Sequence, residues 1–436
     1  MNLLERYFHI RERGSTLSKE IVGGATNFFA MAYLIVVIPA TLAQAGMDYG
    51  AVMAATCIAA ALGSVLTGLF ANVPFAQAPG LGFNTFLVYT LCARYGYTWQ
   101  QALAIVFISG LMFLALTVLP LREKLLDAIP MPLKFALSAG VGLLITLSGL
   151  ISAGIVTADN NLLDIGRLVS PGPLLALAGV FFTAALLLQK VPGAMIIGIV
   201  AVAAAGVPFG VTELPGHVTA AVDLAPVVFQ LDFGGLLSQG VLPLASALLS
   251  LVFTDCFDTV GTLLGVAGDA KLTDNTGSFP GEGRAMMADA AATCAGALLG
   301  VTNVTTMAES AVGVHEGART GLCPVVTGLL FLLVLPFAPL AGAIPGAATA
   351  AAVIIVGMMM MSGISQITWK HVEISLPCFL MIVGMPFTFS ITDGIALGCI
   401  AYVAVMICRK RAAMVNPWMY GLTALFLAMF ALQVLA

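Results

Sequence analysis

Three carboxylates lie inside stretches of this chain that are otherwise apolar enough for a lipid bilayer. Asp255 and Asp258 belong to LVFTDCFDTVGTLLGV, residues 251–266, and Glu309 belongs to GVTNVTTMAESAVGVHEGARTGL, residues 300–322. A charged side chain at the centre of a bilayer costs roughly 2.5–3.5 kcal/mol on insertion scales. Acids kept at such a cost mark substrate or proton pathways by default, so we predict a polar binding site around these three residues.

The spacing of the first two acids suits proton handling. Asp255 and Asp258 are three residues apart, which places them on one face of a helix, and Thr262 follows one turn later. Two carboxylates this close in a low dielectric are not both readily ionised, so one of them is expected to carry a proton. A structural hydrogen bond to a neighbouring helix is the alternative for Asp255. We predict proton coupling through Asp255, Asp258 and Glu309, with Thr262 in gating or packing.

Composition identifies the class of protein. The chain has 436 residues, of which 60% are hydrophobic and 9% charged, with a mean hydropathy of +1.05. Soluble domains carry about 25% charged residues, so this is a polytopic membrane protein. The eight cysteines are scattered and none forms a CxxC pair. The sequence has no metal-ligand spacing, phosphate-binding loop or hydrolase triad, so we expect that the protein binds no metal or cofactor and is not an enzyme.

Apolar segments of about 17–25 residues are long enough to cross a bilayer as helices. We predict an all-α protein with fourteen such spans, at residues 19–44, 50–72, 73–93, 98–120, 133–152, 172–190, 191–209, 240–267, 284–300, 301–317, 320–341, 345–363, 373–390 and 391–408. A further apolar segment, 416–436, follows the basic residues Arg409, Lys410 and Arg411. It is open whether this segment spans, re-enters the membrane or lies on its surface.

Lysine and arginine positions set the expected orientation, because cytoplasmic loops carry the excess of basic residues. With a cytoplasmic N-terminus and fourteen crossings, Arg94 and Arg167 fall outside and the other fifteen of the seventeen basic residues fall inside. The acidic loops 153–171 and 210–239 fit the outside. We therefore expect a multi-pass protein of the cell inner (plasma) membrane. The basic residues expected in cytoplasmic loops are Arg122, Lys124, Lys134, Lys190, Lys271, Arg284, Arg319 and Lys370.

Seven spans precede the loop 210–239 and seven follow it. An odd number in each half gives the halves opposite topology, which predicts a 7+7 inverted repeat of the kind many secondary transporters have. Weak internal similarity supports this, because VPGAMIIGIVAV at 191–202 resembles ITDGIALGCIAY at 391–402. Each of these segments opens the seventh span of its half.

Spans three and ten are both interrupted. The third contains Pro79, Gly80 and Gly82, which do not sustain a helix, and the β-branched run 301–306 in the tenth prefers extended backbone. We expect a short extended strand in each, followed by a half-helix that begins near Glu309 in the second case. Simple kinks are the alternative. Such breaks are tolerated where they line a protein-buried site, and their position in both halves points to the substrate.

Polar residues accompany these breaks. Asn84 follows the first break, and its amide offers donors and an acceptor to the edge of a heterocycle. Glu309 follows the second, where a helix N-terminus favours a carboxylate, with a pure helix cap as the alternative. Asp289 starts the ninth span, and we assign it to packing or gating rather than to direct ligand contact.

Several segments together resemble nucleobase–cation symporter family 2, and within it the AzgA-like branch of purine permeases. The segments are EIVGGATNFFAMAYLIVVIP (20–39), APGLGFNTF (78–86), TDCFDTVGTL (254–263), ADA (288–290), AESAVGVHEGARTGL (308–322) and MPFTFSITDGIALG (385–398). The chain departs from the usual pattern at Asn27, Ala30 and Ile38. Met307 and Ala308 also replace an aromatic and a β-branched residue. These last changes leave adenine, hypoxanthine and guanine all open as substrates.

The resemblance implies a secondary active transporter that imports a purine nucleobase by proton symport. Its core would move like an elevator against a gate, and homodimers through the gate occur in the wider family. The expected substrate-binding residues are Asp258, Glu309, Asn84, Phe83, Ala308 and Thr306, with Asp289 and Thr262 in gating or packing. The expected parts are a cytoplasmic N-terminus (1–18), the core (19–120 and 240–341), the gate with the external loop (121–239), the second part of the gate (342–411) and an extra segment (412–436).

Two other functions are weighed against purine import. An anion exchanger of the related sulfate/bicarbonate fold would share the repeat but would prefer a positively charged site, whereas the site here is acidic. A transporter of another heterocycle, such as xanthine or uracil, would share both the repeat and the acids. Sodium in place of the proton is also open, and we expect no nucleic-acid partner.

Overall fold

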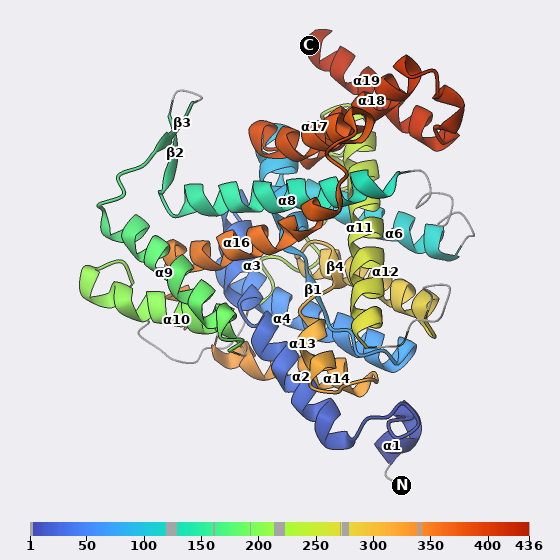
Figure 1. Ribbon diagram of the computed structural model, residues 1–436. Helices are drawn as coiled ribbons and strands as arrows, with labels where there is room; N and C mark the ends of the chain where they lie inside the picture. Colours follow the sequence, from blue (N-terminus) through green and yellow to red (C-terminus); the bar gives the residue numbers. More distant parts are fainter. Residues whose placement is uncertain are drawn as a thin grey trace.

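The computed structural model describes residues 3–118, 129–159, 162–191, 193–212, 223–270, 272, 279–337, 340 and 342–435. Arg122, Lys124, Lys271 and residues 213–222 of the expected external loop, which contribute to the predicted orientation, lie outside these residues. The described chain is mostly helical, with two small sheets of two strands each (Figure 1).

Elements of the first half follow the expected apolar segments. They are α1 (Leu3–Phe8), α2 (Leu17–Met31), α3 (Leu34–Leu42), η1 (Ala43–Ala45), α4 (Tyr49–Leu66), η2 (Thr67–Ala71), β1 (Gln77–Pro79), α5 (Leu81–Thr85), η3 (Phe86–Arg94), α6 (Trp99–Val118), α8 (Met131–Ser152), β2 (Val156–Asp159), β3 (Leu162–Ile165), α9 (Pro171–Leu188), α10 (Ala194–Gly206) and η4 (Val207–Phe209). The strands β2 and β3 form a hairpin inside the segment 153–171, which we expected to be a plain loop.

The second half contains one long helix followed by shorter ones. Its elements are α11 (Val241–Asp269), α12 (Glu282–Leu299), β4 (Val304–Thr306), α13 (Ser310–His315), α14 (Leu322–Val334), η5 (Leu335–Phe337), α16 (Gly346–Met360), η6 (Met361–Gln366), α17 (Val372–Thr388), α18 (Ile391–Cys408), η7 (Ala412–Met414) and α19 (Pro417–Leu435). The segment 416–436, whose fate was open, is helical as α19.

Seven helical segments of the described chain are long and apolar enough to cross a membrane by length and composition. They are Leu17–Ala45, Tyr49–Ala71, Trp99–Val118, Met131–Ser152, Pro171–Leu188, Gly346–Gln366 and Ile391–Cys408. The first of them is not one straight helix as expected, because α2 ends at Met31 and α3 starts again at Leu34. Pro39 lies inside α3, whereas Ala32 and Tyr33 form the break itself.

The two interrupted spans meet as a strand pair at the middle of the molecule. β1 and β4 are antiparallel, with Gln77 opposite Thr306 and Pro79 opposite Val304. Two further backbone bonds extend the pair, from Gly80 N to the Asn303 carbonyl at 3.0 Å and from Met307 N to the Ala76 carbonyl at 3.0 Å. In Figure 1 the pair lies near the middle of the molecule, with α3, α11, α12 and α13 around it. The prediction of extended segments in spans three and ten is therefore confirmed.

Three details of the sequence prediction are wrong. The helix after the first break starts at Leu81 and includes Gly82, because an intact helical turn can accept glycine at a modest cost of about 1 kcal/mol. The extended part of the second break covers Val304–Thr306 rather than the whole β-branched run. Asp289 does not start its helix, since α12 begins at Glu282, about two turns earlier.

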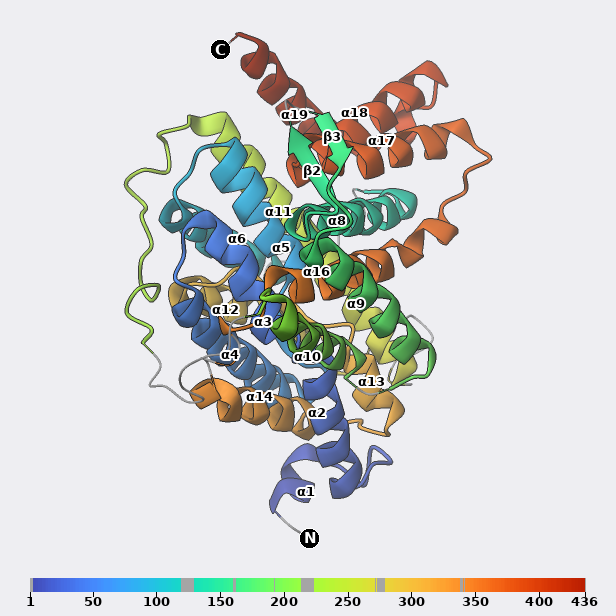
Figure 2. The same ribbon diagram turned by 90° about the vertical axis from the view of Figure 1, so that its left-hand side faces the viewer.

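The helices form two packed groups. α2, α4, α6, α12 and α14 pack around the strand pair, whereas α8, α9, α10, α16, α17 and α18 pack mainly on one another. α3, α5 and α11 touch both groups, through α16, α8 and α18. Figures 1 and 2 show α17, α18 and α19 at the opposite end of the molecule from α1.

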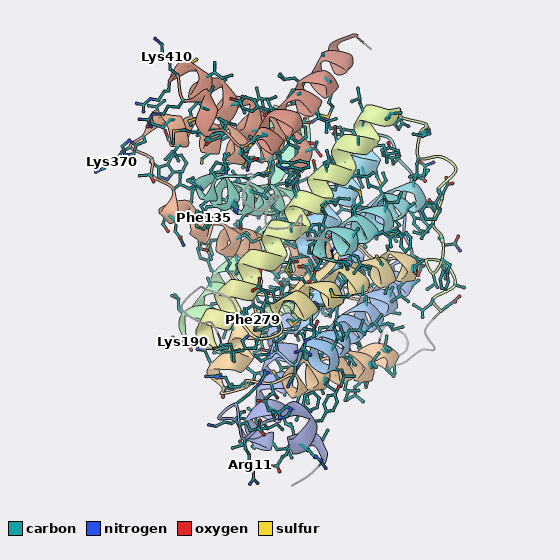
Figure 3. All side chains as sticks on the ribbon, turned by 90° about the vertical axis from the view of Figure 1, so that its right-hand side faces the viewer. Arg11, Phe135, Lys190, Phe279, Lys370 and Lys410 are labelled. Carbon is teal, nitrogen blue, oxygen red and sulfur yellow. The ribbon has the colours of Figure 1, made fainter. Side chains whose placement is uncertain are left out.

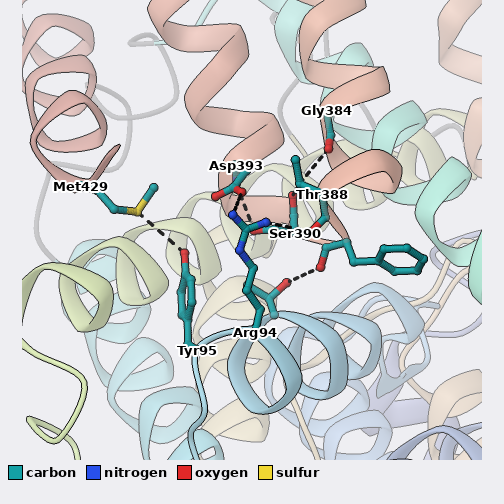
Figure 4. A network of polar contacts seen from close by, with 9 residues as sticks. Arg94, Tyr95, Gly384, Thr388, Ser390, Asp393 and Met429 are labelled. Atoms are coloured by element: carbon teal, nitrogen blue, oxygen red, sulfur yellow. Dashed lines mark hydrogen bonds and ion pairs between the residues drawn. The ribbon is translucent and has the colours of Figure 1, made fainter. Parts of the chain in front are cut away.

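A polar network joins the two groups where η3 meets the start of α18 (Figure 4). The Arg94 guanidinium forms an ion pair with Asp393 at 2.5 Å and donates to the Thr388 carbonyl at 2.8 Å. The Thr90 hydroxyl donates to the Phe389 carbonyl at 3.3 Å. Asp393 is 3% exposed, so this contact is a largely buried one between elements about 300 residues apart in the chain.

Candidate functional site

Asp289 fastens the strand pair to the surrounding helices. Its Oδ1 accepts hydrogen bonds from the Gln77 amide at 3.2 Å and from the Thr306 backbone N–H at 3.0 Å. Its Oδ2 accepts from the Thr259 hydroxyl on α11 at 3.0 Å. All four residues are buried. A single carboxylate thus ties β1, β4 and α11 to α12, and the gating or packing role of Asp289 stays a prediction.

Asp255 and Asn84 are also held by the protein itself. The Asn303 amide, which precedes β4, donates to Asp255 Oδ2 at 2.9 Å. Thr302 donates to the Asn84 side-chain oxygen at 2.9 Å, and the Asn84 amide nitrogen donates to the Gly80 carbonyl at 2.9 Å. Both side chains are fully buried. Asp255 therefore has the structural hydrogen bond that was its alternative reading, and the ligand contact expected of Asn84 stays a prediction.

Glu309 occupies the N-cap position of α13, where the half-helix was expected to begin. Its backbone is anchored on both sides to one residue of the other half, Ala76. The Met307 N–H donates to the Ala76 carbonyl, and the Ala76 N–H donates to the Ser310 hydroxyl at 2.9 Å. The Glu309 side chain accepts a hydrogen bond from the Tyr33 hydroxyl at 2.7 Å. The acid is thus fixed by contacts from the first half of the chain.

Exposure separates the predicted site residues into two sets. Asp258, Thr262 and Glu309 are partly exposed, and Ala308 is exposed. The buried set consists of Asp255, Asp289, Asn84, Thr306 and Phe83. The first set therefore keeps some accessible surface in the structure, whereas the second set has almost none.

The acids are close enough to influence one another. Asp258 interacts electrostatically with Glu309, and Asp255 interacts with Asp258 and with Asp289. The acids of α11, α12 and the start of α13 therefore form one acidic cluster. Such a cluster can bind groups that donate hydrogen bonds, and it can hold a proton.

Four residues of this cluster were missed at the sequence level. Gln77 and Asn303 are polar residues in the interrupted spans, and Thr259 directly follows Asp258, so their positions were usable signals. Tyr33 lies in an apolar first span without proline or glycine beside it, and nothing in its immediate sequence marks it as a partner of an acid.

One sizeable hollow in the described part of the structure is not at this cluster. It has a volume of about 460 Å³ and lies between the ends of α17 and α18. Its lining includes Lys370, Glu373 and Arg409, and the last two form an ion pair at 2.8 Å. None of the predicted site residues lines it, so the polar chemistry of the cluster, rather than the size of a hollow, identifies the candidate site.

The fold is that of a known class of membrane transporters. The transmembrane domain of a cyanobacterial bicarbonate transporter, BicA, superposes with a TM-score of 0.67 over 89% of this chain and 97% of that domain. The anion transporter Slc26a9 of the mouse superposes with a TM-score of 0.61 over 90% of this chain and 69% of that structure. At 17% and 12% sequence identity, these likenesses establish the fold alone.

Sequence similarity assigns the family. Residues 18–397 match the model of a permease family, that of the xanthine/uracil permeases, and the chain belongs to this family, nucleobase–cation symporter family 2. The chain is 41% identical to a putative permease of Methanocaldococcus jannaschii, over 99% of this chain and 98% of that protein. It is 40% identical to the guanine/hypoxanthine permease PbuG of Bacillus subtilis, over 98% and 99% of the two chains. It is 38% identical to the adenine permease AdeP of Escherichia coli, over 98% and 95%. The resemblance in the motifs is thereby confirmed, and the chain is a polytopic membrane permease.

Proposed function

We propose that this permease imports a purine nucleobase together with a proton. The observation that carries the proposal is the pair of partly exposed acids, Asp258 and Glu309, beside two paired strands in a member of a nucleobase permease family. The adenine and the guanine/hypoxanthine permeases among its relatives support a purine, and the choice among these three bases stays open.

In this proposal the acids receive hydrogen bonds from the base. Purines present ring N–H and exocyclic N–H groups, and carboxylate oxygens are acceptors of matching chemistry. Asp258 and Glu309 would take these groups, while Ala308 lines the exposed approach to them. Asp255 and Asp289 keep the strands in place behind them through Asn303 and Thr306. Phe83 and Asn84 are buried, so they would reach the base after a local movement.

The proton would neutralise the acidic cluster during transport. A carboxyl group of the Asp255, Asp258 and Glu309 set takes up a proton, which lowers the cost of moving the cluster through an apolar surrounding. Substrate and proton would then enter together, because the loaded cluster carries less charge than the empty one. This coupling is the part of the proposal that separates a symporter from a passive channel.

The movement proposed is that of the helix group around the strand pair relative to the second group. These groups correspond to the expected core (19–120 and 240–341) and gate (121–239 and 342–411). Fourteen crossings, a 7+7 inverted repeat and a homodimer through the gate belong to the same proposal. The Arg94–Asp393 contact joins the groups at one end, so a core movement must break it.

The orientation proposed is a cytoplasmic N-terminus in the cell inner membrane. Figure 3 shows Lys190, Lys370 and Lys410 along one side of the molecule, which supports a common cytoplasmic face by the positive-inside rule. Arg94 is one of the two basic residues expected on the outer side of the membrane, and it forms the ion pair with Asp393.

Anion exchange is the weaker reading. The bicarbonate transporter shares the fold, but at 17% identity that likeness carries no substrate. An anion would be repelled by the negative charge of the cluster of Asp255, Asp258, Asp289 and Glu309.

The test is uptake of radiolabelled adenine, hypoxanthine, guanine, xanthine and uracil by cells that lack their own permeases. We expect saturable purine uptake that a protonophore abolishes. Glu309→Gln should abolish or uncouple uptake while the variant still reaches the membrane. Glu316→Gln, at the C-cap position of the same short helix α13, is the matched control that should leave uptake unchanged. Proton-coupled uptake at the normal rate by Glu309→Gln would refute the assignment of this residue, and uptake of none of the bases would refute the substrate class.

A further inference from the structure

Tyr33 is held rigidly at the break in the first span. The backbone N–H groups of Val36 and Val37 donate to its carbonyl at 3.1 and 3.0 Å, so the residue forms the first turn of α3. Its side chain is 1% exposed and belongs to the main apolar core. A tyrosine buried in this way needs a partner for its hydroxyl, and that partner is Glu309.

The hydrogen bond between these two side chains is short and joins the two halves of the chain. The Tyr33 hydroxyl lies 2.7 Å from Glu309 Oε1, although the residues are 276 positions apart. Hydrogen bonds from a neutral donor to a carboxylate are among the stronger ones in proteins. Because Ala76 also anchors the backbone on either side of Glu309, both ends of the bond are fixed.

This arrangement makes the two carboxylate oxygens of Glu309 different from each other. Oε1 accepts from the phenol, which prevents free rotation of the carboxyl group about its last torsion angle. Oε2 does not take part in the bond to Tyr33, and Glu309 as a whole is partly exposed. An acid with one oxygen already engaged presents a single, oriented acceptor rather than two interchangeable ones.

We propose that Tyr33 is a positioning residue for substrate recognition: it orients Glu309 so that Oε2 receives an N–H group of the base. The inference rests on the proposed function, because it names what Glu309 needs in order to bind a purine. It also ties the break between α2 and α3 to the binding acid, so that a movement of the first span changes the geometry of the site.

Tyr33→Phe removes the hydroxyl and keeps the ring. We expect the KM for purine uptake to rise about tenfold or more, the factor that loss of one hydrogen bond to a charged group produces, with Vmax per transporter at the membrane little changed. Tyr97→Phe is the matched control: Tyr97 is 3% exposed and its hydroxyl donates to the Leu236 carbonyl at 3.3 Å, away from the acids. Its KM should stay at the wild-type value. A wild-type KM in Tyr33→Phe would overturn the inference, as would equal increases in both variants.

A second measurement needs no transport. Infrared difference spectra of the ligand-free purified protein between high and low pH should contain a carboxyl band of Glu309, which is identified by its loss in Glu309→Gln. Tyr33→Phe should shift this band and Tyr97→Phe should leave it in place, since only the first variant loses a hydrogen bond to the acid. Absence of purine uptake by the wild type would refute the proposed function, whereas an unshifted band would refute the positioning role of Tyr33.

Discussion

Replacing Asp289 by alanine should remove the hydrogen bonds that hold β1 and β4 to α12 and so destabilise the protein. The change removes the acceptor of two buried donors, the Thr306 backbone N–H and the Gln77 amide, and the described contacts offer neither of them another acceptor. The third donor, Thr259, lies 3.0 Å from the Thr305 hydroxyl and can turn to it. An unsatisfied buried donor costs about 1–3 kcal/mol, so two of them cost about 4 kcal/mol.

Asparagine at the same position is the matched comparison. Its carbonyl oxygen can still accept from Thr306 and Gln77, and its amide can donate to the Thr259 hydroxyl, which then donates to Thr305. The hydrogen-bond pattern is thereby kept without the charge, and we expect the free energy of unfolding to change by about 1 kcal/mol or less.

Thermal unfolding in detergent, followed by intrinsic fluorescence, measures the difference. A chain of this size loses about 1–2 °C in Tm per kcal/mol, so Asp289→Ala should unfold roughly 4–8 °C below the wild type and Asp289→Asn within about 2 °C of it. Equal losses in both variants would show that the charge, rather than the set of acceptors, holds the strands. An unchanged Tm in Asp289→Ala would refute the anchoring role altogether.

Two further changes test contacts between distant segments. Asp393→Asn should lower the free energy of unfolding by about 1–3 kcal/mol, which is less than for a fully buried ion pair because Arg94 is 32% exposed. The double variant with the two charges exchanged, Arg94→Asp/Asp393→Arg, should regain most of this free energy in the same thermal assay. No recovery in the double variant would argue against a direct ion pair. Gly321→Ala should reduce the folded yield severely, because an added Cβ would meet the Gly68 carbonyl, whereas Gly172→Ala, with nothing within 4 Å, should not; equal yields would show that α14 can move away.

The sequence was sufficient for the positions of most elements, because hydropathy and chain-breaking residues act locally. α9 and α18 begin and end within a residue or two of the segments 172–190 and 391–408. The two strands were found because proline next to glycine in the third span, and a run of β-branched and polar residues in the tenth, disfavour a helix. The break between α2 and α3 was missed for the same reason: no proline or glycine stands at that point, and the contact of Tyr33 with Glu309 is made only in the folded chain.

The partners of the acids are likewise a property of the folded chain. The cost of burying a carboxylate predicts that Asp255 and Asp289 must have donors, but it does not say which residues supply them. The donors are Asn303 for the first and Gln77, Thr259 and Thr306 for the second. Gln77 and Thr306 are brought together by the pairing of β1 with β4, Asn303 directly precedes β4, and Thr259 comes from α11. Sequence spacing does not encode this pairing, since the strands lie in different halves of the chain.

The division of labour between Asp255 and Asp258 shows where spacing stops being informative. Residues three apart on a helix differ by about 60° in direction, so both were expected on one face. Because of that angle, the Asp255 side chain is directed at Asn303 and has no exposed surface. Asp258 stays partly exposed and interacts electrostatically with Glu309. In the proposed function, Asp258 would therefore be the residue of the pair that meets the base, and Asp255 would take part in proton coupling through Asp258 or after its bond to Asn303 breaks.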